Sequence, residues 1–257
     1  MVSKKNDKAE KLVEIKREYF NNINEKAKYI AHNISHGKKG NKATPVLLKY
    51  ISELYKSANV EKEFNNTLFD SAYHQPVTSD FELLIARALY YISNRKKLGW
   101  KIYLRRQHKD NGVVVTPDIK IEKEGKVVAI IEVKAKAGWM QSFFSNIRRD
   151  KDFEQNKNPD ELIAKVKKQI DKYVQIEGAN KNKVFVLLPT FIHVSRKNND
   201  ETVEDFRKAF AYNSGLSKDN LILLSKNKSL NLADIKNDDK IDATDDFERF
   251  IEKIEKF

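Results

Sequence analysis

Two apolar runs rich in β-branched residues, 113–121 and 127–133, occupy the middle of the chain. The segment between them is charged and contains Gly125. Valine and isoleucine favour strands, and a short polar segment with a glycine favours a turn. The two runs therefore predict an antiparallel β-hairpin in which three charged residues, Asp118, Glu132 and Lys134, stand in an apolar setting.

The alternation of side chains along a strand relates these three charges to one another. Glu132 and Lys134 share one face of their strand, and Val133 points to the other. If the pairing brings Asp118 opposite them, two carboxylates and an ammonium group converge on one small site. Burial of unpaired charge there is costly, and Mg²⁺ compensates for it by binding one or two carboxylates together with water and phosphate oxygens.

The hairpin carries a pattern known from a nuclease family. Pro117-Asp118, thirteen intervening residues and then Glu132-Val133-Lys134 resembles the PD-(D/E)xK nuclease superfamily, over about residues 78–190. The resemblance implies that Asp118, Glu132 and Val133 bind a divalent metal, Mg²⁺. It also implies that Lys134 orients or activates the attacking water.

A second interpretation of the same residues is a surface hairpin with an ordinary Glu–Lys pair. An acid-x-Lys triplet is common in a chain that is 33% charged. Only the strand context distinguishes the two interpretations, because a motif needs its structural setting.

The overall charge points to a polyanionic partner. Forty-nine basic and 37 acidic residues give a net charge of +12 and an isoelectric point of about 9.5, which suit double-stranded DNA. The alternative source of this charge is a general bias toward lysine. The chain has no cysteine and five scattered histidines, so disulfides and thiolate metal sites are excluded and a zinc site is not expected.

The length of 257 residues suits one domain with a smaller helical addition. We expect an N-terminal helical region over 1–76, a nuclease core over 77–225 and a helical tail over 226–257. The expected fold class is α/β, with a mixed central sheet flanked by helices, as in restriction endonucleases. The first residues lack an apolar signal segment and no run is long enough to span a bilayer, so a cytoplasmic protein is expected.

Apolar periodicity and capping residues predict the remaining elements. Helices are expected over 8–31, from Thr44-Pro45 to Tyr55, from Ser79 to Tyr91, from Asn158-Pro159 to Tyr173, over 203–212 and near the C-terminus, with strands over 100–106, 184–188 and 221–224.

Glu82 has two interpretations. Ser79 and Glu82 have the spacing of a capping box, in which the glutamate binds a backbone N–H at the helix start. Many members of the superfamily instead carry a glutamate on a helix before the central sheet, where it holds a metal directly or through water. The resemblance therefore makes Glu82 a candidate catalytic residue.

Several residues around the hairpin are candidates for DNA binding. Seven basic residues and no acidic one fall between 95 and 109, and such a cluster would attract a phosphodiester backbone. Gln169 and Tyr173 match a Gln-xxx-Tyr feature that supports the site and DNA in some branches of the superfamily. The full set of DNA-binding candidates is Arg105, Arg106, Lys136, Gln141, Arg148, Arg149, Gln169 and Tyr173.

The expected function is Mg²⁺-dependent hydrolysis of phosphodiester bonds in double-stranded DNA. Within the superfamily, a compact chain of this kind most resembles a type II restriction endonuclease, which typically acts as a homodimer on a short duplex site. Two alternatives stay open: a repair or recombination nuclease with little sequence preference, and a DNA-binding module that has the fold but does not cleave.

Overall fold

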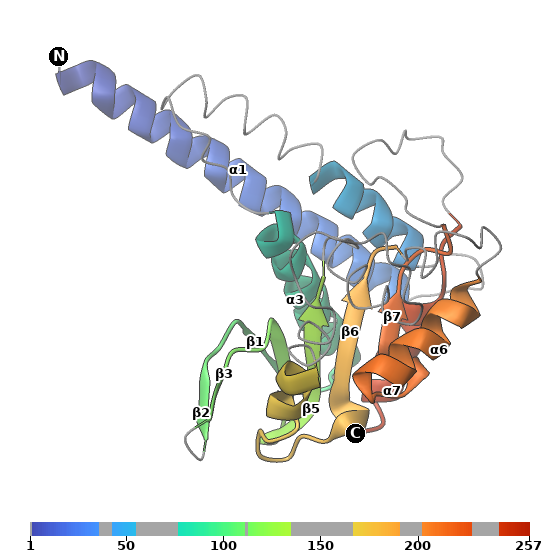
Figure 1. The fold of residues 1–257 in the computed structure, drawn as a ribbon. Coiled ribbons are helices and arrows are strands. Elements are labelled where there is room, and N and C mark those ends of the chain that lie inside the picture. Colours follow the sequence, from blue (N-terminus) through green and yellow to red (C-terminus); the bar gives the residue numbers. More distant parts are fainter. Residues whose placement is uncertain are drawn as a thin grey trace, which may run out of the picture.

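The computed structural model of the chain describes residues 2–35, 43–54, 77–110, 113–134, 167–190, 202–227 and 242–257. It is a mixed α/β structure built on a five-stranded sheet with the order β1-β4-β5-β6-β7 (Figure 1). The strands of this sheet are β1 (Trp100–Leu104), β4 (Ile119–Lys123), β5 (Lys126–Val133), β6 (Val184–Leu188) and β7 (Leu221–Leu223). The expected mixed central sheet is confirmed.

The predicted hairpin forms the centre of the sheet. Strands β4 and β5 pair antiparallel, with Ile119 opposite Ile131, and β1 pairs antiparallel with the other edge of β4. Strands β6 and β7 add in parallel on the far side of β5. Strand β5 is therefore the middle strand, and its side chains from 127 to 133 are all buried.

The first apolar run is two strands rather than one. Strand β3 (Val113–Val115) ends before Thr116-Pro117-Asp118, and β4 begins only after that turn. Proline has no N–H to donate, so it interrupts the pairing at this point. Strand β3 instead pairs antiparallel with β2 (His108–Asp110) as a separate two-stranded sheet.

Helices cover both faces of the main sheet. One face packs against α1 (Val2–Ser35), the helix over 43–54, α3 (Val77–Lys96) and α7 (Asp246–Ile254), which share one hydrophobic core with the strands. The other face packs against the helical residues 167–173 and α6 (Val203–Ser214). Figure 1 shows α1 crossing α3, with the 43–54 helix beside the C-terminal half of α1.

Several predicted helix boundaries are wrong. Helix α1 begins at Val2, before the predicted start at residue 8, and runs past the predicted end at residue 31 to Ser35, because Asn33 and the partly buried Ile34 still pack in its last turn. Helix α6 ends at Ser214, two residues after the predicted end. Helix α3 begins at Val77, so Ser79 lies inside the first turn and is not its N-cap. The capping-box interpretation of Ser79 and Glu82 is therefore wrong.

Other predicted elements are confirmed within the described ranges, namely the strands at 184–188 and 221–223, the helix from Val203 and the C-terminal helix. The predicted start of the helix at Asn158 lies outside them. Among the described helices, none is long and apolar enough to cross a membrane.

Candidate active site

Asp118 and Glu132 lie side by side at one end of the β4–β5 hairpin. Asp118 directly precedes β4, and the pairing of Ile119 with Ile131 places it next to Glu132 on the neighbouring strand. A carboxylate oxygen of Asp118 accepts a hydrogen bond from the backbone N–H of Val133 at 2.8 Å. The structure therefore brings together the two acids that the sequence analysis selected.

The side chain of Glu132 is held by three donors. One carboxylate oxygen accepts from the Lys134 ammonium group and from the Gln169 amide, the latter at 2.9 Å. The other oxygen accepts from the Tyr173 hydroxyl. Glu132 is only 6% exposed and lies on the middle strand of the sheet, so the interpretation as a surface hairpin is wrong.

Gln169 and Tyr173 contact the proposed metal-binding residue directly. They lie one turn apart on the helical segment 167–173, which covers the sheet face that Glu132 occupies. The Gln169 amide nitrogen also lies 2.8 Å from the Tyr173 hydroxyl. Both side chains are thereby engaged with Glu132, and their predicted contact with DNA stays a prediction.

Glu82 pairs with an arginine, Arg105, that directly follows strand β1. The Arg105 guanidinium donates to both carboxylate oxygens of Glu82, at 2.5 and 2.9 Å, and to the Ser79 hydroxyl at 2.9 Å. Glu82 is 2% exposed, and a bidentate arginine–carboxylate pair is strong and directional. The Arg105 side chain also stays 48% exposed, and its predicted contact with DNA stays a prediction.

The charges of these residues act on one another. Burial raises the pKa of Asp118 to about 7, with further contributions from the negative charges of Glu132 and Glu82, while the Val133 N–H and Lys134 act in the opposite direction. Among the residues that the structure describes, three carboxylates at this site face two cations, Lys134 and Arg105. The site therefore has an excess of negative charge and disfavours ionisation of Asp118.

Tyr173 stays a hydrogen-bond donor. Burial, followed by the charge of Glu132, raises the pKa of its hydroxyl well above the ordinary value. The hydroxyl therefore keeps its proton at neutral pH and donates to Glu132. This contact fixes the direction in which the Glu132 carboxylate points.

The donor set suits Mg²⁺ bound partly by substrate. In the part of the chain that the structure describes, no three His, Cys, Asp or Glu side chains form a group that could hold a metal ion alone. Mg²⁺ does not require such a group, because it usually binds one or two carboxylates and completes its shell with water and phosphate oxygens. Asp118, Glu132 and the main-chain carbonyl of Val133 are residue types of that kind, and the excess negative charge favours a cation.

The remaining candidates fall into two groups. Arg106 is exposed and lies over the Tyr103 ring, 4.7 Å from its centre. The other four, Lys136, Gln141, Arg148 and Arg149, lie outside the described residues.

A second charged cluster lies farther along β4, and sequence reasoning missed it. The Lys120 side chain is only 5% exposed, and its ammonium group pairs with Glu122. The same ammonium nitrogen lies 3.5 Å from a ring nitrogen of His108. The side chains of Asp118, Lys120 and Glu122 alternate with Ile119 and Ile121, which pack in the core. This alternation was the available signal that Lys120 lies on the same sheet face as the candidate site.

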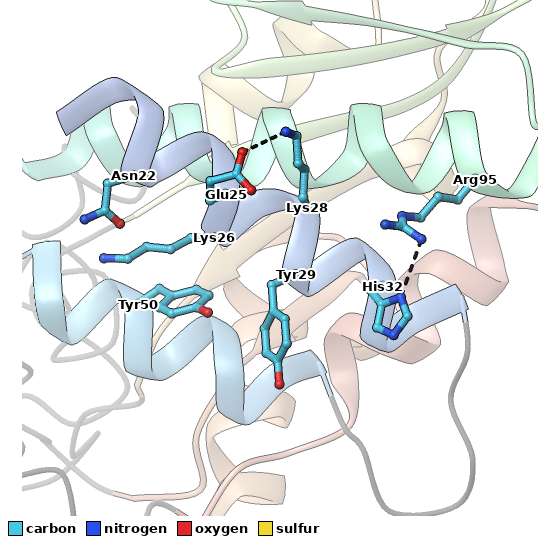
Figure 2. Close-up of a pocket in the computed structure, with 8 residues that line it drawn as sticks. All are labelled: Asn22, Glu25, Lys26, Lys28, Tyr29, His32, Tyr50 and Arg95. Carbon is cyan, nitrogen blue, oxygen red and sulfur yellow. Dashed lines mark hydrogen bonds and ion pairs between the residues drawn. The ribbon is translucent and has the colours of Figure 1, made fainter. Parts of the chain in front are cut away.

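A polar hollow on the helical layer is separate from the candidate site. It lies between α1, the 43–54 helix and α3, and Figure 2 shows its lining. Its cations are paired locally: Lys28 binds Glu25 at 2.7 Å, and Arg95 lies 3.5 Å from His32. None of the residues selected from the sequence lines it.

Comparisons with protein-family models, with curated proteins and with solved structures found no match to this chain. The functional interpretation therefore depends on the geometry of the site.

Proposed function

We propose that this chain is a Mg²⁺-dependent endonuclease that hydrolyses phosphodiester bonds of double-stranded DNA, with a restriction-endonuclease-like fold. The observation that supports this most is the position of Asp118 beside Glu132 at the end of one hairpin, with Lys134 paired to Glu132. Two acids and an amine that meet in an enclosed site provide both a cation-binding group and a group that contacts the nucleophile.

Each residue of the site has its own role in the proposed hydrolysis. Asp118, Glu132 and the Val133 carbonyl hold Mg²⁺, which when bound polarises the phosphate and lowers the pKa of a water molecule. Lys134 positions the attacking water with its ammonium group. Tyr173 and Gln169 orient Glu132 through the hydrogen bonds described above, so they act as positioning residues.

Glu82 acts beside this set. Its charge adds to the negative potential at Asp118, and Arg105 fixes its carboxylate by two hydrogen bonds. In this proposal Glu82 would help to hold Mg²⁺, and Arg105 fixes the orientation of the Glu82 carboxylate. The net charge of +12 attracts the DNA backbone toward a site that is itself negative.

Within this class we favour a site-specific, type II restriction endonuclease that acts as a homodimer. The test is a digest of supercoiled plasmid DNA by the purified chain with Mg²⁺. Discrete fragments are expected, and chelation with EDTA should abolish them. Asp118→Asn and Lys134→Gln should each lower the cleavage rate at least about 100-fold, because each removes a group that acts on the reacting atoms.

Matched controls come from the opposite end of the same hairpin. Glu124→Gln and Lys126→Ala remove the same kinds of charge from exposed positions and should leave the rate unchanged. A smear or loss from DNA ends would favour a repair or recombination nuclease. Binding without cutting under any divalent ion would indicate a non-cleaving module, and undiminished cutting by Asp118→Asn would contradict the assignment.

A further inference from the structure

The β2–β3 ribbon continues the hairpin that carries the candidate site. The pairing of β2 with β3, in which His108 faces Val115, keeps the register of β1 with β4, in which Leu104 faces Ile119. Between the two sheets, the Arg105 N–H donates to the Asp118 carbonyl at 2.9 Å. The ribbon is therefore one antiparallel extension whose base is Asp118 itself.

The break at the base sets the direction of the ribbon. Arg105 adopts a left-handed backbone conformation with φ of 47°, and Pro117 on the other strand cannot donate a hydrogen bond. The two strands consequently leave the plane of the main sheet together. Figure 1 shows them projecting from the body of the molecule on the side away from α6 and α7.

The two faces of the ribbon differ. His108 and Val115 form one cross-strand pair, in which Val115 is buried in the core and His108 lies beside Lys120. Lys109 and Val114 form the next pair, and both are exposed, Val114 by 45%. One face thus anchors the ribbon to the body, and the opposite face is left to solvent.

The exposed side chains of the ribbon and its base suit nucleic acid. Arg106, Gln107 and Lys109 are exposed, and the two strands contain one acidic residue, Asp110, at the end of β2. Arginine, lysine and glutamine donate hydrogen bonds to base edges and phosphates, and an exposed valine can contact a thymine methyl group. A ribbon that served only as a structural brace would not require this set.

The width of the β2–β3 ribbon determines which groove of duplex DNA it can enter. Two strands about 4.8 Å apart, with their side chains, fit the major groove, which is about 12 Å wide, but not the minor groove of about 6 Å. Lys109 is four residues beyond Arg105, or about 13 Å along an extended chain. A ribbon lying in the groove would thus reach bases about four base pairs from the phosphate at Asp118, at about 3.4 Å for each pair.

We infer that the β2–β3 ribbon enters the major groove of duplex DNA and positions the scissile phosphate at Asp118. This inference rests on the proposed function and names the element that binds its substrate. Arg106 and Lys109 are the residues expected to contact the DNA, and Arg105 couples their position to the site through its bond to the Asp118 carbonyl.

The test measures binding separately from cleavage. The probe is a pool of duplexes with a randomised centre, bound in Ca²⁺ in place of Mg²⁺ and followed by fluorescence anisotropy. The double variant Arg106→Ala/Lys109→Ala should weaken binding about tenfold or more. Lys126→Ala, an exposed lysine at the other end of the hairpin, should change it less than about twofold, and circular dichroism should show that both variants keep the fold.

Dimethyl sulfate footprinting identifies the groove, because it methylates guanine N7 in the major groove and adenine N3 in the minor groove. Guanines should be protected by the wild-type protein and by Lys126→Ala, and should become reactive with the double variant. Lys109→Glu should have the same effect without removing the Arg106 stack on Tyr103.

The possible outcomes separate this inference from the proposed function. If the wild-type chain cuts DNA and the double variant binds and cuts equally well, the ribbon inference is overturned and the nuclease proposal stands. Protection of adenine N3 alone would also overturn it, as would a ribbon variant whose only change is loss of dimer in sedimentation. If Asp118→Asn cuts as fast as the wild type while ribbon variants lose binding, the nuclease assignment fails and the ribbon remains the DNA-binding element.

Discussion

Two charged clusters on one face of the same sheet contain the same pair of residue types. In the Asp118 cluster, Glu132 pairs with Lys134 close to Asp118, Glu82 and Arg105. In the Lys120 cluster, Lys120 pairs with Glu122 beside His108. In both clusters the lysine and the glutamate are two positions apart in the sequence. The clusters differ in the residues that the tertiary structure places around each pair.

The difference is the balance of charge. Glu122 is partly buried, which acts to raise its pKa, yet hydrogen bonds from Lys120 and then Tyr103 hold that pKa below the usual value. His108 has its pKa lowered by burial and by the charge of Lys120, and Lys120 pairs with Glu122, so the Lys120 cluster has no excess of carboxylates over cations. The Asp118 cluster, among the described residues, has three carboxylates against two cations. A buried pair of opposite charges stabilises the fold, whereas an excess of carboxylates favours the binding of a cation.

The strongest test of this comparison neutralises the matching glutamate in each cluster. Glu122→Gln should lower the free energy of unfolding by about 3 kcal/mol, because it leaves the Lys120 ammonium group buried without a counterion. Cleavage per folded molecule should be retained. Glu132→Gln should show the reverse, with a cleavage rate at least about 100-fold lower and a smaller loss of stability.

Urea denaturation and initial rates of plasmid nicking measure these two quantities. Loss of cleavage in folded Glu122→Gln would show that the Lys120 cluster also takes part in the chemistry. Equal effects of both variants on stability would show that the charge balance does not distinguish the clusters.

A second prediction concerns pH. The pKa of Asp118 rises from 3.8 to about 7 in the fold, so the folded state keeps a proton that the unfolded chain releases between these values. Stability without metal should therefore fall as pH rises through this range. Asp118→Asn cannot ionise, so it should be more stable than the wild type by about 1–2 kcal/mol near pH 8 and should lose this advantage near pH 4.

Thermal unfolding in EDTA at a series of pH values measures this difference. Glu122→Gln should show no such gain near neutral pH, since its charge is already balanced. A wild-type protein whose stability does not change between these pH values would contradict the excess of negative charge at Asp118. Added Mg²⁺ should remove the advantage of Asp118→Asn, because it stabilises only the ionised wild-type site.

The smallest effect is expected from Tyr173→Phe, which removes one hydrogen bond to Glu132 and keeps the ring that packs in the core. The loss of about 1 kcal/mol in orienting Glu132 corresponds to a roughly fivefold lower cleavage rate. A higher Mg²⁺ concentration should be needed for half-maximal rate. Tyr212→Phe, on an exposed tyrosine of α6, is the control. An unchanged Mg²⁺ dependence in Tyr173→Phe would show that the hydroxyl does not position Glu132.

Local patterns explain which elements were predictable. The hairpin, the buried strand at 184–188 and the helix from Val203 follow from periodicities that a short window contains. The sequence also showed Pro117 within the first apolar run. That this proline divides the run into β3 and β4 could not be predicted, because the division depends on β3 pairing with β2 and β4 pairing with β5. Helix starts were less predictable, as the start of α3 at Val77 illustrates, because packing can extend a helix beyond its best capping residue.

The sequence by itself determined that Asp118, Glu132 and Lys134 stand on or directly beside the two strands of one hairpin, since alternation within a strand and the pairing of neighbouring runs are local consequences of the residues. Only the tertiary structure decided which groups surround them. Tyr173 reaches Glu132 from a separate helix, Arg105 binds Glu82, and Lys120 is buried against Glu122. The first two contacts join residues that are far apart in the chain, and the charge balance around all three depends on distance and burial, which no spacing in the sequence specifies.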